Sequence, residues 1–254
     1  MSHVATELKD RVLTIRFDRL DKKNALLRSM YAAAANALND AKANPEVRVV
    51  LFAGSPDCFC AGNDIVDFLN TPENDPDSPV AKFMLALAGM DKPVIAAASG
   101  LAIGIGVTLL LHCDLVYLGE KTRLEMPFIN LGICPEFASS YILPRMMGHQ
   151  RASELLLCGP FDAAKAREYG LANLVVPNAE VEAVARQRAV AVAQLPPNAV
   201  RVTKGLLRRW SDKVATEAMH AEIGNFMPML RKPEALEALN AFTQKRKPDF
   251  SRFS

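Results

Sequence analysis

Two glycine-bearing segments, residues 59–64 (FCAGND) and 100–106 (GLAIGIG), each follow an expected buried strand and precede an expected helix. Glycine lets a ligand approach the backbone closely, and the first N–H groups of a helix have no partner within the helix. Such groups favour negative charge. Two turns of this kind that face each other would form an oxyanion hole, which stabilises the oxygen of a reacting carbonyl group. Tight packing of strand against helix is the alternative reason for the glycines.

One acidic residue lies in a mostly apolar segment that could change its chemistry. Glu136 occurs in LGICPEFASSY, near Phe128, Ile133 and Phe137 in the chain. A glutamate with an ordinary pKa of about 4.3 is a weak base toward carbon, but burial among apolar groups raises that pKa toward neutrality. A base of this kind could carry a proton between two carbon atoms. Capping of the following helix, or exposure to solvent, is the alternative role.

Other catalytic classes lack the residues they need. The Gly104-x-Gly106 turn has neither the third glycine nor the acidic partner of a dinucleotide-binding fingerprint. None of the four histidines has a serine or cysteine partner that the sequence identifies, so a hydrolase triad is not supported. The five cysteines include no C-x-x-C pair, and no zinc-binding pattern is present.

The composition indicates a folded protein with one substantial core, or one core with a small appended subdomain. The chain has 254 residues, of which 50% are hydrophobic and 23% charged. Its net charge of +2 is too small to indicate nucleic acid or an anionic membrane as the main partner. The odd number of cysteines and the lack of a secretory signal pattern favour a cytoplasmic location.

The elements that must position these residues alternate between strand and helix, which predicts a layered α/β core with parallel neighbours. An uncharged stretch at residues 94–111 is long enough to span a membrane, but its glycines divide it into a strand, a turn and a helix. Residues 71–79 are expected to form a surface loop. We predict strands at 12–17, 47–53, 93–98, 114–118 and 173–176. We predict helices at 27–43, 139–147, 151–158, 163–169 and 180–194. A short helix that ends near residue 90, a helix that follows the glycine turn and ends at 112, and several helices between 195 and about 245 are expected as well.

Five segments, taken together and in order, resemble the crotonase (enoyl-CoA hydratase/isomerase) superfamily over almost the whole chain. They are RLDKKNAL, FCAGNDI, GLAIGIGVTLLLHCDLVY, PFINLGICPEFASSYILPRMMG and LCGPFDAAKAREYGLANLVV. The resemblance implies an α/β fold in which a spiral of repeated ββα units binds a coenzyme A thioester. The core would comprise residues 1–194, and residues 195–254 would form a helical oligomerisation subdomain. A homotrimer or a dimer of trimers is implied as well.

The resemblance also assigns roles to residues. The backbone N–H groups of Asn63 and Ile105 would hold the thioester oxygen, and Phe128, Ile133 and Phe137 would line the acyl pocket. Coenzyme A is part of the substrate, and the resemblance implies no further cofactor and no metal. Residues expected along the coenzyme A groove are Lys22, Asn24, Ala25, Leu26, Ala61, Gly62, Asp64 and Ile65. Phe242 and Lys245 are expected near the coenzyme A phosphate, either of the same subunit or of a neighbouring one. Lys22 and Lys245 could instead be solvated surface charges.

The choice of reaction depends on the carboxylates. Hydratases of the superfamily use two carboxylates, and Thr108 and Phe128 stand at those positions here. The segments AGND, LPPNAVRVTK and LGICPEFASSY are closer to the 3,2-trans-enoyl-CoA isomerase branch, in which a glutamate matching Glu136 is the acid and base. Phe137 departs from that branch, where glycine is more usual. We expect conversion of 3-enoyl-CoA to trans-2-enoyl-CoA, with slow hydration or non-catalytic acyl-CoA binding as the alternatives.

Overall fold

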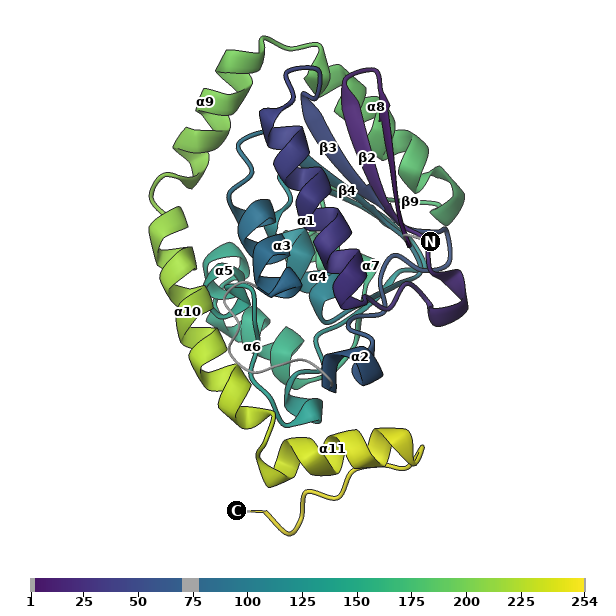
Figure 1. The fold of residues 1–254 in the computed structure, drawn as a ribbon, viewed down its shortest axis with the longest axis vertical. Coiled ribbons are helices and arrows are strands. Elements are labelled where there is room, and N and C mark those ends of the chain that lie inside the picture. The colour runs from purple at the N-terminus through teal and green to yellow at the C-terminus, as the bar shows by residue number, and fades with distance from the viewer. Residues whose placement is uncertain (1–2, 70–77, 254) are drawn as a thin grey trace.

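A computed structural model describes residues 3–69 and 78–253 of the chain. Figure 1 shows a central sheet with helices on both faces and a run of helices at the C-terminal end. This arrangement confirms the predicted α/β class with C-terminal helices. Residues 71–77 of the predicted surface loop lie outside the described residues, and Ser78 caps the helix that follows by accepting a hydrogen bond from the N–H of Ala81 at 3.2 Å.

The main sheet has six strands in the order β1-β2-β3-β4-β6-β9. β1 and β2 are antiparallel, and each later neighbour is parallel to the one before it. Parallel strands need both faces covered, which explains their continuous apolar sequences. The strands are β1 (Val4–Lys9), β2 (Val12–Phe17), β3 (Val49–Ala53), β4 (Val94–Ala98), β6 (Leu115–Gly119) and β9 (Leu174–Val176).

The two faces of the sheet bury alternate residues of each strand. On one face, Val50 and Phe52 of β3 join a large core that includes α1 (Arg28–Ala43) and α3 (Pro79–Ala88). On the other face, Val49 and Leu51 pack in a smaller core with α8 (Val181–Ala193). The apolar alternation therefore places α1 and α3 opposite α8, as Figure 1 shows.

A second, three-stranded sheet has the order β5-β7-β8. Its strands are β5 (Leu101–Ile103), β7 (Arg123–Glu125) and β8 (Phe161–Asp162). These three strands were absent from the sequence-based expectation, because strands of two or three residues carry too little alternation to be recognised. β1 was absent from it as well: only Val4 of its six residues is buried, so this strand shows no alternation between buried and exposed positions. The uncharged stretch at 94–111 divides into β4, β5, α4 (Ile105–Thr108) and the first part of η2 (Leu109–His112), a 3-10 helix. Among the described residues, no helix is both long and apolar enough to cross a membrane.

The remaining helices lie mainly in the second half of the chain. α10 packs against α5, and α11 packs against η3. Figure 1 shows α9 and α10 along one side of the molecule and α11 beyond its end. The bounds are η1 (Leu20–Lys22), α2 (Ile65–Leu69), η3 (Ile129–Leu131), α5 (Ser139–Met147), α6 (His149–Leu157), α7 (Ala163–Glu168), η4 (Asn178–Glu180), α9 (Pro197–Arg208), α10 (Asp212–Met229) and α11 (Pro233–Thr243).

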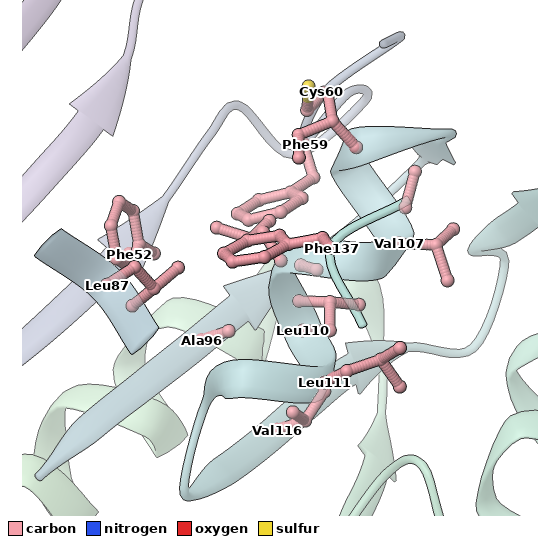
Figure 2. Close-up of a cluster of buried hydrophobic side chains, with 14 of the residues drawn as sticks. Phe52, Phe59, Cys60, Leu87, Ala96, Val107, Leu110, Leu111, Val116 and Phe137 are labelled. Carbon is pink, nitrogen blue, oxygen red and sulfur yellow. The ribbon is translucent and has the colours of Figure 1, made fainter. Parts of the chain in front are cut away.

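Aromatic side chains fill the core between the sheet and the helices α1 and α3. The ring of Phe17 lies 6.0 Å from that of Phe52 and 5.9 Å from that of Phe59, centroid to centroid. Phe83 of α3 lies 6.5 Å from Phe137. Figure 2 shows Phe52, Phe59 and Phe137 among the buried side chains of this cluster. Phe137 is thus part of this cluster and connects it to the neighbouring residue Glu136.

Candidate active site

Backbone hydrogen bonds join the two glycine turns. The N–H of Cys60 donates to the carbonyl of Leu101 at 3.0 Å, and the N–H of Ile103 donates to the carbonyl of Cys60 at 2.9 Å. A Cβ atom at Gly106 would lie 2.5 Å from the Cys60 oxygen, so only glycine allows this approach. Gly104 has φ +54° and ψ −117°, a conformation that glycine alone adopts without strain. The two glycine turns therefore lie side by side.

Asn63 and Ile105 present backbone N–H groups at these two turns. Leu26 donates to the carbonyl of Gly62 at 2.8 Å and accepts from the N–H of Asp64 at 2.9 Å. In such a parallel bridge successive N–H groups alternate in direction, so the N–H of Asn63 points away from Leu26. Ile105 begins α4, and its N–H has no partner within that helix. Within the described part of the chain neither N–H makes a backbone hydrogen bond.

Glu136 is a buried carboxyl group with one oxygen held and the other unpaired. Glu136 is only 7% exposed. The hydroxyl of Thr108 donates to Oε1 at 2.5 Å, whereas Oε2 has no hydrogen-bond partner among the described residues. Burial raises the pKa of Glu136 to about 8; the Thr108 hydrogen bond lowers it and the nearby charge of Glu222 raises it. A buried oxygen without a partner is uncommon and marks a position that a proton or a ligand atom can occupy.

The loop that carries Glu136 is held in a strained conformation. Phe137 and Ala138 have φ angles of +60° and +58°, a region that bulky residues rarely adopt. Glu222 of α10 holds this loop: its carboxylate accepts from the N–H of Ala138 at 2.6 Å and from the N–H of Ser140 at 2.8 Å. Glu222 therefore caps α5, which leaves the Glu136 carboxyl group free of the capping role considered from the sequence.

The three residues predicted for the acyl pocket are all buried. Phe128, Ile133 and Phe137 are 6%, 5% and 1% exposed. The Phe137 ring stacks on His112 with 3.8 Å between ring centroids, and the His112 ring nitrogen Nε2 lies 2.8 Å from the Phe137 carbonyl oxygen. Burial lowers the pKa of His112 to about 4, so the imidazole is neutral near pH 7 and serves to support the ring of Phe137.

The first group of residues predicted along the coenzyme A groove lies together. The N–H of Ala61 donates to the carbonyl of Lys23 at 3.1 Å, which places residues 22–26 beside residues 61–65. Lys22 is exposed, Leu26 and Gly62 are buried, and Ala25, Ala61 and Ile65 are partly buried.

Two members of this group have side chains that are already engaged inside the protein. Asn24 is fully buried; its side chain donates to the carbonyl of Cys58 at 2.9 Å and accepts from the N–H of Arg19 at 2.7 Å. Asp64 accepts a 2.8 Å hydrogen bond from Arg19, which holds the pKa of this carboxyl group below its usual range. Because both side chains are engaged inside the protein, we expect these two residues to contact a ligand through their backbone atoms.

Phe242 and Lys245 are not brought to this group. Phe242 is 59% exposed near the end of α11, and Lys245 follows that helix with its side chain exposed. Within the described residues, neither has a hydrogen bond or ion pair with the turns or with Glu136. A role for them near a phosphate therefore stays a prediction that involves a second subunit.

Sequence reasoning missed Tyr31 and Glu222. The Tyr31 hydroxyl donates to Oδ1 of Asn63 at 2.5 Å, and the Tyr31 side chain is in a residue only 2% exposed. The lone aromatic residue in an alanine-rich helix was the available signal for Tyr31. No local pattern pointed to Glu222, because its partners lie more than 80 residues away in the chain.

The fold is that of the crotonase superfamily. The sequence profile of the family described as "Enoyl-CoA hydratase/isomerase" matches residues 7–252, and the chain belongs to that family.

Relatives within the family include both isomerases and hydratases. Enoyl-CoA delta isomerase 2 from Rattus norvegicus is 34% identical over 218 residues, 83% of this chain and 55% of that protein. This chain thus spans about half the length of that relative. The 2,3-dehydroadipyl-CoA hydratase of Escherichia coli (strain K12) is 32% identical over 256 residues, 98% of this chain and 99% of that protein.

Solved structures agree closely with the fold. The structure of Pseudomonas aeruginosa OdaA is 49% identical with a TM-score of 0.93, covering 95% of this chain and 99% of that chain. An enoyl-CoA hydratase/isomerase from Pseudoalteromonas atlantica T6c is 36% identical with a TM-score of 0.94, covering 98% of this chain and 100% of that chain.

Proposed function

We propose that this chain is an enoyl-CoA isomerase that converts 3-enoyl-CoA to trans-2-enoyl-CoA in fatty acid oxidation. The observation that carries the proposal is the carboxyl group of Glu136, which is buried, has its pKa raised to about 8 and leaves Oε2 unpaired among the described residues. A carboxyl group with this pKa can both accept and return a proton near neutral pH. The rat delta isomerase named above supports the same assignment.

The reaction needs one group that moves a proton between two carbons. Glu136 removes a proton from C2 of the 3-enoyl thioester, and the C–H electron pair moves to give a dienolate whose charge rests on the thioester oxygen. The N–H groups of Asn63 and Ile105 donate to that oxygen. Reprotonation at C4 by the same carboxyl group moves the double bond from C3–C4 to C2–C3. Loss of one such donor typically slows a reaction by about 10² to 10³.

The two positions that hold carboxylates in hydratases of the superfamily are occupied here by residues without a carboxyl group, which supports isomerisation. Thr108 supplies a hydroxyl group, and Phe128 supplies an apolar ring that is 6% exposed. Glu222 is the carboxylate whose charge raises the pKa of Glu136. Its oxygens accept hydrogen bonds from the N–H groups of Ala138 and Ser140. The second carboxylate that the hydratase pattern needs to activate water is therefore not supplied by Thr108, Phe128 or Glu222.

The remaining roles follow from the same proposal. Coenzyme A would lie along residues 22–26 and 61–65, and the acyl group would lie against Phe128, Ile133 and Phe137. The chain would act as a homotrimer or a dimer of trimers through residues 195–254, where Phe242 and Lys245 of one subunit would approach coenzyme A on another. We place the protein in the cytoplasm, and the reaction requires neither a metal nor a further cofactor.

A hydratase is the second candidate, because the Escherichia coli hydratase matches along its full length. In that case Glu136 would activate water alone. Turnover of 3-hexenoyl-CoA measured beside hydration of crotonyl-CoA separates the two activities. We expect isomerisation to exceed hydration by at least about 10²-fold, on the scale that a positioned acid or base contributes. Faster hydration than isomerisation would reject the proposal.

The base itself is tested with Glu136→Gln, which keeps the size of the side chain. We expect isomerisation to fall by about 10³-fold or more. Glu217→Gln on the exposed side of α10 is the matched control and should retain full activity, because Glu217 pairs only with the solvated Lys213 at 3.9 Å among its described contacts. Full activity in Glu136→Gln would remove the proposed base. Tight binding of acyl-CoA with no turnover of any enoyl-CoA by the wild type would favour a non-catalytic binding protein.

A further inference from the structure

Tyr31 connects the first helix to the turn that carries Asn63. Its hydroxyl donates a 2.5 Å hydrogen bond to the side-chain oxygen Oδ1 of Asn63. The backbone of the same turn is bonded to Leu26, which lies just before α1. The Asn63 residue is thus held on two sides, through its backbone neighbours by Leu26 and through its side chain by Tyr31.

The position of Tyr31 is itself fixed by packing. Its ring makes an edge contact with Phe83 of α3, with 5.5 Å between centroids, and Phe83 lies 6.5 Å from Phe137. The start of α1 is held by Asp67 of α2, whose carboxylate accepts from the N–H of Arg28 at 2.7 Å. The hydroxyl of Tyr31 therefore has little freedom to leave Asn63, and the aromatic contacts extend from it to the loop that carries Glu136.

The state of the phenol suits a constant hydrogen-bond donor. Burial raises the pKa of Tyr31 well above its usual range, and the charges of Cys60 and Glu136 raise it further. The phenol therefore stays protonated across the pH range in which Glu136 titrates.

We infer that Tyr31 is a positioning residue, which aligns the Asn63 N–H with the developing charge on the thioester oxygen by holding the Asn63 side chain. The inference rests on the proposed function, since the charge develops only if a proton leaves C2. A donor that is free to rotate must be reoriented during the reaction, whereas a donor held in place is already aligned. Tyr31 does not itself need to touch the substrate.

The kinetic test uses Tyr31→Phe, which removes the hydroxyl and keeps the ring. We expect kcat for 3-hexenoyl-CoA to fall about 10-fold, less than the loss of a whole donor, with KM changed by less than about 2-fold. Asn63→Ala keeps the backbone N–H and should give the same loss, and the double variant should lose no more than either single variant. Multiplying losses in the double variant would overturn the inference, because Tyr31 would then act independently of Asn63.

Tyr117→Phe is the matched control. Tyr117 is a comparably buried tyrosine in β6 that packs in the smaller core on the other face of the sheet. Its variant should retain kcat and KM. An equal loss of kcat in this control would show that removal of any buried phenol slows the enzyme, and the inference would be withdrawn.

A readout without turnover separates this inference from the isomerase proposal. Infrared spectra of bound butanoyl-CoA with a ¹³C-labelled thioester carbonyl report hydrogen bonding to that oxygen directly. We expect the carbonyl band to shift to lower frequency on binding to the wild type and to lose part of that shift in Tyr31→Phe but not in Tyr117→Phe. An unchanged shift in Tyr31→Phe contradicts the inference even if isomerisation is confirmed. If the wild type has no isomerase activity but the band shift is smaller in Tyr31→Phe, the positioning role of Tyr31 is kept and only the proposed reaction is rejected.

Discussion

The hydroxyl of Thr108 donates a 2.5 Å hydrogen bond to Oε1 of Glu136. This contact fixes the carboxyl group and leaves Oε2 as the atom that can exchange a proton, because Oε2 has no partner among the described residues. The same contact opposes the effect of burial on the pKa of Glu136. Thr108 thus controls both the orientation and the basicity of the proposed base.

The first prediction concerns the dependence of activity on pH. A base must be ionised to accept a proton, so kcat/KM for 3-hexenoyl-CoA should rise with pH through about 8 and level off above it. Thr108→Val keeps the shape of the side chain and removes the donor, so its midpoint should move to higher pH. Initial rates measured as a function of pH at fixed ionic strength give both midpoints. A rate independent of pH between 6 and 9 would contradict Glu136 as the base.

The second prediction concerns stability. Because the folded-state pKa of Glu136 is raised from about 4.5 to about 8, the folded state retains a proton that the unfolded state releases. The resulting loss of stability is absent below pH 4.5, grows as pH rises and is complete above pH 8. The free energy of unfolding of Glu136→Gln should therefore exceed that of the wild type by on the order of a few kcal/mol at pH 8.5 and by much less at pH 5. Unfolding in urea at the two pH values measures this difference. An equal difference at both pH values would contradict the raised pKa.

The third prediction concerns Glu222. Replacing it with alanine leaves the buried N–H of Ala138 without its partner and should reduce the free energy of unfolding by about 2–3 kcal/mol. Isomerase activity should fall as well, because the loop of Glu136 loses its anchor. Glu217→Ala, also on α10 but exposed, is the control and should change stability by less than about 0.5 kcal/mol. Unfolding in urea and initial rates measure the two effects separately.

The fourth prediction concerns the acyl group. Phe137 is buried next to Glu136 and has a φ of +60°, which glycine adopts without strain. Phe137→Gly should therefore keep the loop conformation while removing the ring, and the ratio of kcat/KM for 3-dodecenoyl-CoA to that for 3-hexenoyl-CoA should rise about 10-fold or more, the scale of a few extra buried methylenes. Phe52→Leu, in the same core, should lower stability without changing the ratio. An unchanged ratio in Phe137→Gly would place the end of the acyl pocket elsewhere.

The fifth prediction concerns assembly. On α9, Lys204 faces inward and donates to the Lys92 carbonyl at 2.8 Å, whereas Leu207 and, just beyond the helix, Trp210 are 81% and 78% exposed. Apolar side chains this exposed are typical of a surface that another subunit covers. Leu207→Glu with Trp210→Glu should shift the mass measured by light scattering toward the monomer, and Lys213→Glu should not. A wild type that is monomeric at micromolar concentration would contradict the proposed trimer.

Much of the fold could be predicted from the sequence because its long elements carry strong patterns. The predicted helix at 27–43 is observed as Arg28–Ala43, and the helix at 139–147 has the predicted ends. Asp162 caps α7 by accepting a hydrogen bond from the N–H of Lys165 at 2.8 Å. Strands β5, β7 and β8 could not be predicted in this way, since each forms only in the presence of its partner strands.

The candidate site was predictable where it depends on local sequence. The two glycine turns and the apolar setting of Glu136 were read from neighbouring residues, and the structure brings the turns together. The contacts of Tyr31 with Asn63 and of Glu222 with Ala138 join residues 32 and 84 positions apart, so no local pattern reveals them. The role of Thr108 was missed for a different reason: the position was examined for a carboxylate, and its hydroxyl was not considered as a donor to one.

The joining of residues 60–62 to residues 101–106 by main-chain atoms has a consequence for how such proteins diverge. Because Ile105 would contribute only its peptide group, most exchanges of its side chain leave that contribution intact, whereas Gly106 cannot change without forcing the two turns apart. New chemistry can then arise at positions 108, 128 and 136, where acidic groups can be gained or lost on an unaltered framework. Introducing glutamate at position 108 is accordingly the shortest route by which a designer could explore hydration in this scaffold.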